Sequence, residues 1–258
     1  MTEPRSLTAA GLLDTEIRPV VRGAVLARLR DGRLQPQKGP SVTLVTLTLD
    51  RSITDTELEQ LRLATDASAA FRLPPVVTHA YTRARDLGFK GSSTPEVGRL
   101  LAVLAAAVPS GGRILELGTG AGVGLAWIVH GLGERKDVAV ISVEHDREKL
   151  GVLERVDWPS FVSIIAGDAV RLARTLGGFD LIFADTPGRG KLYSLAHAVG
   201  ALLPGGILIL DDMAIVDAPP ARRARLASVR NQLFGSPDLC CTELPISGAL
   251  LLASRRRQ

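Results

Sequence analysis

From Arg113 onward the chain alternates short, continuous apolar runs with segments of helix length, and this alternation constrains its fold more than any other feature. Strands that are apolar along their whole length are typical of a parallel sheet covered by helices on both faces. A Pro-Ile-Ser-Gly turn separates the last two runs, which indicates a hairpin and an antiparallel end to the sheet. We expect an α/β fold with a doubly wound, mostly parallel sheet. Its predicted strands are 113–116, 137–144, 162–166, 179–185, 207–211, 239–244 and 249–254, and its predicted helices 124–132, 147–153, 169–176 and 192–202.

The first third of the chain has a different pattern. The periodicity predicts a basic amphipathic helix over 18–30, a strand over 41–49, and helices over 75–87 and 95–108. Gly, Gln and Pro are frequent between Arg30 and Pro40, which favours a boundary there. We therefore divide the chain into an N-terminal appendage (1–50), a helical cap region (51–110) and a core (111–258).

Composition and charge exclude several classes of protein. The longest apolar stretch, around Leu100 to Val108, is about half of the ~18 residues that a membrane-spanning helix requires. No basic start followed by an apolar segment marks a signal peptide, so we expect a cytoplasmic protein. The net charge of +4 comes from scattered arginines, so nucleic acid is not the expected partner. Cys240 and Cys241 are neighbours without another possible partner and are expected to be reduced.

A glycine-rich segment directly follows the first predicted strand of the core. It runs Glu116-Leu-Gly118-Thr119-Gly120-Ala-Gly122-Val-Gly124 and leads into a predicted helix. Glycines at this place let the backbone turn tightly and approach a ligand at a helix N-terminus. The dinucleotide pattern G-x-G-x-x-G would need glycine at Val123, so a nucleotide-dependent oxidoreductase fits poorly. The spacing E-x-G-x-G-x-G instead resembles that of S-adenosylmethionine (SAM)-dependent methyltransferases of the Rossmann-like class.

An acid ends the next predicted strand. The carboxylate of Glu144 can accept hydrogen bonds from both ribose hydroxyls of a bound nucleoside, although acids are also common at strand ends for structural reasons. His145 follows it and either packs along the adenine or lies exposed in the linker.

Three aspartates follow two further predicted strands: Asp185 closes the fourth, and Asp211 and Asp212 close the fifth. Because neighbouring strands lie about 4.8 Å apart, we expect these carboxylates to converge at one edge of the sheet. Clustered anions repel unless a cation or a proton separates them, and oxygen ligands favour Mg²⁺ over softer metals. The alternative is that the aspartates cap strands and hydrogen-bond to loops.

Taken in order, several motifs resemble the catechol-type, metal-dependent O-methyltransferase family and its bacterial relatives. They are SSTPEVGRLL from Ser92, ILELGTGAGVGLAW, GDA, FDLIFAD, a nearby Gly-Lys, and LLPGGILILDDM. The similarity covers roughly residues 74–254, and the appendage lies outside it. The catechol enzymes have Asp-Asn where this chain has Asp211-Asp212.

The resemblance implies roles for particular residues. Asp185, Asp211 and Asp212 would hold the metal, and Lys191 would act as the base that removes the proton of the acceptor hydroxyl, with Asp185 beside it. Asp168 would contact the adenine amino group. The implied cofactor-binding residues are Ser92, Glu116, Gly118, Thr119, Gly120, Gly122, Glu144, His145, Asp168, Ala169 and Asp185.

We therefore expect a SAM-dependent methyltransferase that acts on a small-molecule hydroxyl with the help of Mg²⁺. Two alternatives remain open: a metal-independent N- or carboxyl-methyltransferase, and a non-catalytic partner protein that keeps the fold. The alternating strand and apolar helix face of the appendage need a partner, so we also expect a homodimer.

Overall fold

The computed structural model describes residues 29–30, 33–34, 72–168, 172, 176–186, 189–215 and 218–257; of 29–30, 33–34 and 189–194 it describes the backbone alone. The chain divides into two units, Met1–Arg72 and Leu73–Gln258. The expected division into an appendage (1–50), a helical cap region (51–110) and a core (111–258) stays a prediction.

The first unit contains a two-stranded antiparallel ladder. Strand β1 (Leu29–Arg30) pairs with β2 (Arg33–Leu34). The prediction that the helix over 18–30 extends to Arg30 is therefore wrong. The reason lies in the sequence, because Asp31-Gly32 between the two strands is a dipeptide that favours two-residue hairpins. The expected strand over 41–49 and most of the expected helix lie outside the described residues.

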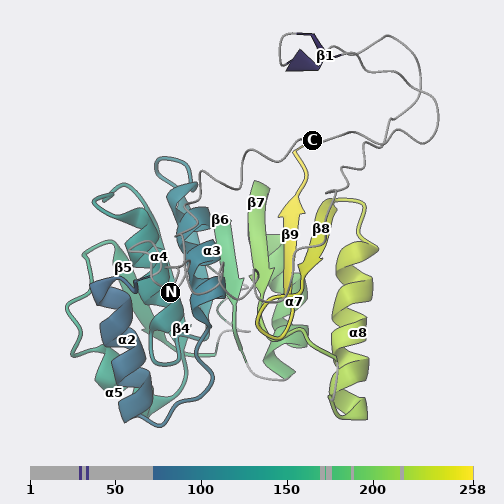
Figure 1. The fold of residues 1–258 in the computed structure, drawn as a ribbon. Coiled ribbons are helices and arrows are strands. Elements are labelled where there is room, and N and C mark those ends of the chain that lie inside the picture. The colour runs from purple at the N-terminus through teal and green to yellow at the C-terminus, as the bar shows by residue number, and fades with distance from the viewer. Residues whose placement is uncertain are drawn as a thin grey trace, which may run out of the picture. The chain divides into compact units, whose positions relative to one another are not determined.

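The second unit is built on a seven-stranded sheet in the order β5-β4-β3-β6-β7-β9-β8 (Figure 1). The first five strands in that order are parallel, whereas β9 is antiparallel to both β7 and β8. This confirms the α/β, Rossmann-like sheet with an antiparallel end. The strands are β3 (Arg113–Leu117), β4 (Ala139–Glu144), β5 (Val162–Ala166), β6 (Phe179–Ala184), β7 (Leu202–Leu210), β8 (Leu239–Leu244) and β9 (Leu250–Arg255).

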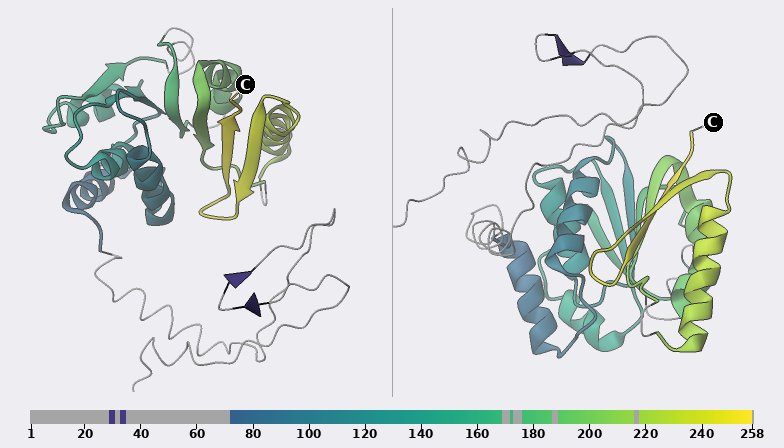
Figure 2. Two further views of the ribbon diagram at one scale, coloured as in Figure 1. Left: turned by 90° about the horizontal axis from the view of Figure 1, so that it is seen from above. Right: turned by 45° about the vertical axis from the view of Figure 1, so that its right-hand side comes forward.

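Helices cover both faces of this sheet, and each face has its own apolar core (Figure 2). Successive residues of β3 point to opposite faces, so Ile114 joins one core and Leu115 joins the other. The first core is completed by α2 (Pro75–Asp86), α3 (Pro95–Ala106) and α4 (Val123–Leu132). The second core is completed by α7 (Arg189–Ala201) and α8 (Pro220–Phe234).

Local sequence signals explain where several helices begin. Pro95 starts α3 at the first helical position, where a missing N–H costs nothing. The short helix α5 (Arg147–Leu153) is capped by Asp146, whose carboxylate accepts the backbone N–H groups of Glu148 and Lys149 at 2.9 and 3.3 Å. Among the described residues, no helix is long and apolar enough to span a membrane.

Candidate active site

A cavity of about 520 Å³ opens at the carboxyl ends of the parallel strands. Parallel α/β sheets place their ligands at this edge, where loops leave the strands for the next helix. The lining combines the glycine loop after β3, the α2–α3 loop and acids that follow the neighbouring strands. Its residues are Phe89, Gly91, Ser92, Ser93, Glu116, Gly118, Thr119, Gly120, Ala121, Val123, Gly124, Val143, Glu144, His145, Lys149, Gly167, Asp168, Phe183, Asp185, Thr186 and Asp212.

The glycine loop needs glycine at Gly118 for two reasons. Its φ of +97° lies in the left-handed region, and a Cβ there would lie 2.5 Å from the carbonyl oxygen of Asp185. The backbone that follows β3 therefore lies close to the backbone that follows β6, beside the cavity. A side chain also stabilises the loop: Arg83 Nε donates a hydrogen bond to the carbonyl oxygen of Ala121 at 2.8 Å.

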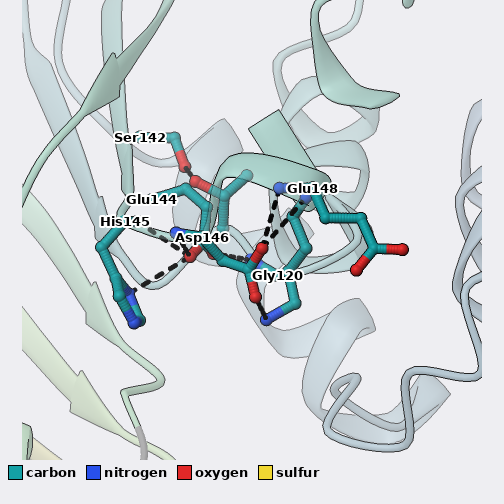
Figure 3. Close-up of polar contacts among 8 residues, drawn as sticks. Gly120, Ser142, Glu144, His145, Asp146 and Glu148 are labelled. Carbon is teal, nitrogen blue, oxygen red and sulfur yellow. Dashed lines mark hydrogen bonds and ion pairs between the residues drawn. The ribbon is translucent and has the colours of Figure 1, made fainter. Parts of the chain in front are cut away.

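Glu144 is buried at the end of β4 with its carboxylate on the cavity wall. Its Oε2 accepts the N–H of Gly120 at 2.7 Å, and its Oε1 accepts the N–H groups of His145 and Asp146 at 2.8 and 2.9 Å (Figure 3). These bonds fix the carboxylate without using all of its lone pairs, because each ionised carboxylate oxygen can accept more than one hydrogen bond. A ligand hydroxyl can therefore bind to Oε2 beside the glycine loop.

Glu116, the acid that opens the glycine motif, is only 1% exposed. The pKa of this carboxyl is raised to about 8, chiefly by burial and also by the charges of Asp185 and Glu144, while the hydrogen bond from Ser142 opposes the rise. The Ser142 hydroxyl donates to Glu116 Oε2 and lies 2.5 Å from Thr119 Oγ1. This buried chain of hydroxyls links Glu116 to the glycine loop.

The three aspartates after β6 and β7 do not occupy equivalent places. Asp185 and Asp212 line the cavity, whereas Asp211 is 4% exposed and lies outside the lining. Asp211 Oδ1 accepts the N–H of Asp212 at 2.7 Å, and Asp212 has a left-handed backbone with φ of 55°. In the part of the chain that the structure describes, no three His, Cys, Asp or Glu side chains are placed to hold a metal ion. The three carboxylates as described therefore do not fit the expected magnesium site.

The other residues singled out from the sequence do not all line the cavity. Ser92, Thr119, His145 and Asp168 line the cavity, and the His145 side chain is 75% exposed. Gly122 is absent from the lining but begins α4 as its N-cap, with φ of 80°. Lys191 lies in the first turn of α7, and its side chain is not among those described. Ala169 lies outside the described residues.

Among the lining residues that were not expected as site residues from the sequence are Phe89, Lys149 and Thr186. The Lys149 ammonium lies 4.6 Å from the centroid of the Phe89 ring and 3.3 Å from Asp146 Oδ2. Phe89 in turn packs on Gly120, where an added Cβ would lie 2.8 Å from the ring. Of these three residues, only Thr186 could have been proposed from the sequence, because it directly follows Asp185, the acid at the end of a predicted strand.

Comparisons with known proteins give the family of the chain. A methyltransferase domain family matches residues 115–213. The chain is 30% identical over 191 residues to a protein of Mycobacterium sp. (strain JLS) named "Putative O-methyltransferase", covering 70% of this chain and 86% of that protein. A protein of Mycobacterium avium (strain 104) with the same name is 31% identical over 205 residues, covering 75% of this chain and 91% of that protein.

Solved structures show the same fold. The O-methyltransferase TomG from Streptomyces achromogenes, in complex with SAM, superimposes with a TM-score of 0.67 at 19% identity, covering 80% of this chain and all of that one. An O-methyltransferase from Bacillus cereus in complex with SAH gives a TM-score of 0.64 at 17% identity, covering 76% of this chain and 96% of that one. Together with the sequence relatives, these matches show that the chain belongs to the O-methyltransferase family of class I, SAM-dependent methyltransferases.

Proposed function

We propose that this protein transfers the methyl group of SAM to a hydroxyl oxygen of a small molecule bound in the cavity. The observation that carries this proposal is the order of polar groups along one edge of the sheet. Asp168 follows β5, Glu144 ends β4, the glycine loop follows β3, and Asp185 follows β6, all on the lining of one cavity. A nucleoside cofactor and an acceptor can therefore lie end to end along this edge.

In this proposal the cofactor lies over the glycine loop. Its ribose hydroxyls donate to Glu144, the buried acid beside Gly120, and its adenine lies near Asp168 and His145. Thr119 and Ser92 line the same cavity and contribute to the cofactor site. The support for this placement is the burial of Glu144 together with its fixed orientation by three backbone N–H groups.

The acceptor lies beyond the glycine loop, near Asp185 and Asp212. Its hydroxyl oxygen attacks the methyl carbon of SAM; the carbon–sulfur bond breaks, its electron pair stays on sulfur, and S-adenosylhomocysteine (SAH) is released. Lys191 is the proposed base that takes the hydroxyl proton, and its support is its position in the first turn of the helix that follows Asp185. Such a transfer depends chiefly on positioning, which can supply on the order of 7 to 11 kcal/mol.

A divalent cation such as Mg²⁺ stays a prediction that rests on the family resemblance. Asp211, one of the three expected ligands, lies outside the cavity lining. Two of the three aspartates do face the cavity, so a cation held there would lie at the acceptor end.

Transfer of a labelled methyl group from SAM tests the proposal. The purified protein is incubated with a catechol or with an aromatic amine, each with Mg²⁺ and with EDTA. Methylation of the catechol supports O-transfer, and its loss in EDTA supports a metal. Methylation of the amine alone would favour the metal-independent alternative and overturn the proposal. Lys191→Met should lower turnover with the catechol, whereas Lys136→Met, which changes an exposed lysine, should not.

We further propose that the protein acts in the cytoplasm as a homodimer to which the appendage (1–50) contributes. The support is the sequence pattern of the appendage, whose alternating strand needs a pairing partner. Sedimentation of the full chain and of a chain lacking residues 1–50 tests this. A dimer that becomes monomeric on deletion supports the proposal, and a full chain that is itself monomeric overturns it.

A further inference from the structure

An arginine contacts the glycine loop from outside the cavity. Arg83, on α2, is not part of the cavity lining, yet its Nε donates to the carbonyl oxygen of Ala121 at 2.8 Å, and Ala121 does line the cavity. The same peptide bond is also held at its other polar group, because the N–H of Gly122 donates to the carbonyl oxygen of Thr119 at 2.8 Å. Both polar groups of the Ala121–Gly122 peptide are therefore paired, which fixes the orientation of its plane.

The absence of a side chain at Gly122 leaves room for this arginine. A Cβ at Gly122 would lie 2.9 Å from Arg83 Nη2 and 2.8 Å from the Leu153 side chain, which is closer than side chains approach one another. Gly122 is also absent from the lining of the cavity. These contacts indicate that the third glycine of the motif accommodates the guanidinium rather than a ligand.

An aromatic ring supports the guanidinium. Arg83 Cζ lies 5.6 Å from the centroid of the Trp158 ring, within the range of a cation–π attraction. Trp158 follows α5, and its Nε1 donates to the carbonyl oxygen of Leu153 at 3.2 Å, which holds the ring in place. Burial lowers the pKa of the Arg83 guanidinium, and the same loss of solvent strengthens the hydrogen bond that it donates to the loop.

We propose that Arg83 is a positioning residue for SAM, which acts through the Ala121–Gly122 peptide and holds the glycine loop in its cofactor-binding conformation. A loop that samples other conformations binds more weakly, because the apparent affinity falls with the fraction of competent protein. Helix α2, all of which is described, thus contributes to cofactor affinity although none of its residues lines the cavity. The proposal rests on the proposed function in one respect, the placement of the cofactor over this loop.

Calorimetric titration with SAH tests this role, at a temperature well below the Tm of every variant. Arg83→Met should weaken SAH binding about tenfold, because it removes a hydrogen bond from a charged donor to the loop. Arg83→Lys keeps the charge but loses the planar group that stacks on Trp158, so its affinity should lie between those of Arg83→Met and wild type. Trp158→Leu removes only the supporting ring and should weaken binding about threefold.

Arg113 provides a matched control, because it makes the same kinds of contact at the opposite edge of the sheet. Its guanidinium donates to the carbonyl oxygens of Leu176 and Gly178 at 2.8 and 3.0 Å and lies 4.5 Å from the centroid of the Phe179 ring. Arg113 starts β3, whereas the cavity lies at the carboxyl ends of the parallel strands. Arg113→Met should therefore lower the Tm and leave SAH binding unchanged.

Two results would overturn the proposal. One is wild-type affinity for SAH in Arg83→Met. The other is an equal loss of affinity in Arg83→Met and Arg113→Met, which would mean that any loss of stability weakens binding. Should Arg83→Met fail to fold, Trp158→Leu decides, and wild-type affinity in that variant overturns the proposal. A wild-type protein that binds no SAH would instead refute the proposed function itself.

Discussion

The backbone N–H of Gly120 donates to Glu144 Oε2 at 2.7 Å, and this bond ties the glycine loop to the end of β4. The same carboxylate accepts two N–H groups from the residues that start the next loop. One acid thus fixes the two backbone segments between which a nucleoside would bind. The cavity is held in shape by groups that also line it, so substitutions there affect both folding and binding.

Gly118→Ala should destabilise the fold and abolish SAM binding. A side chain at φ of +97° is strained, and its Cβ would press on the carbonyl of Asp185. We expect a loss of at least about 2 kcal/mol in the free energy of unfolding by urea titration. Gly151→Ala in α5 is the control; nothing lies within 4 Å of its Cβ position, and the change should stabilise the helix by about 0.5–1 kcal/mol. A Gly118→Ala protein as stable as wild type would show that the loop adopts another conformation.

Stability should depend on pH through Glu116. Its pKa is raised by burial from an ordinary 4.5 to about 8, so the folded state holds a proton that the unfolded state releases. The stabilisation is complete below about pH 4.5 and is lost as the pH rises toward 8. Glu116→Gln cannot titrate, so the difference in unfolding free energy between variant and wild type should shift in favour of the variant across this range. Parallel pH profiles for the two proteins would contradict the shifted pKa.

Arg230 and Glu243 should be energetically coupled. Arg230 Nε donates to Glu243 Oε2 at 2.9 Å, and Nη2 donates both to Glu243 Oε1 and to the carbonyl of Met213, next to Asp212. A double-mutant cycle with Arg230→Met and Glu243→Gln should give a coupling of about 1–2 kcal/mol in unfolding free energy. The exposed pair Arg85–Asp86 provides the comparison and should give less than about 0.5 kcal/mol. If the effects of the two substitutions on the unfolding free energy are additive, the interaction between Arg230 and Glu243 does not stabilise the fold.

The sequence predicted the sheet well because its strands are apolar on both faces and their limits are marked by glycine and acidic residues. It did not predict α8. Two prolines and three arginines dominate the start of that segment, while its buried stripe is narrow: Leu226, Val229 and Leu233. The expected helix over 169–176 lies largely outside the described residues.

The candidate site was predicted at its glycine loop and at Glu144, since backbone geometry and strand-end position can be inferred from spacing. The convergence of the three aspartates was not a safe inference. Asp211 and Asp212 both follow the end of β7, and Asp212 has a left-handed backbone with φ of 55°; Asp211 is buried, whereas Asp212 lines the cavity. Phe89 and Lys149 belong to segments that only the tertiary fold brings to the loop.

Titration of the protein with SAM by calorimetry tests the central claim most directly. We predict one saturable site in wild type, at least tenfold weaker binding by Glu144→Gln, and wild-type binding by Glu154→Gln, which changes an exposed glutamate after α5. Wild-type protein without a saturable SAM site, or Glu144→Gln binding as tightly as Glu154→Gln, would contradict a cofactor held at the glycine loop.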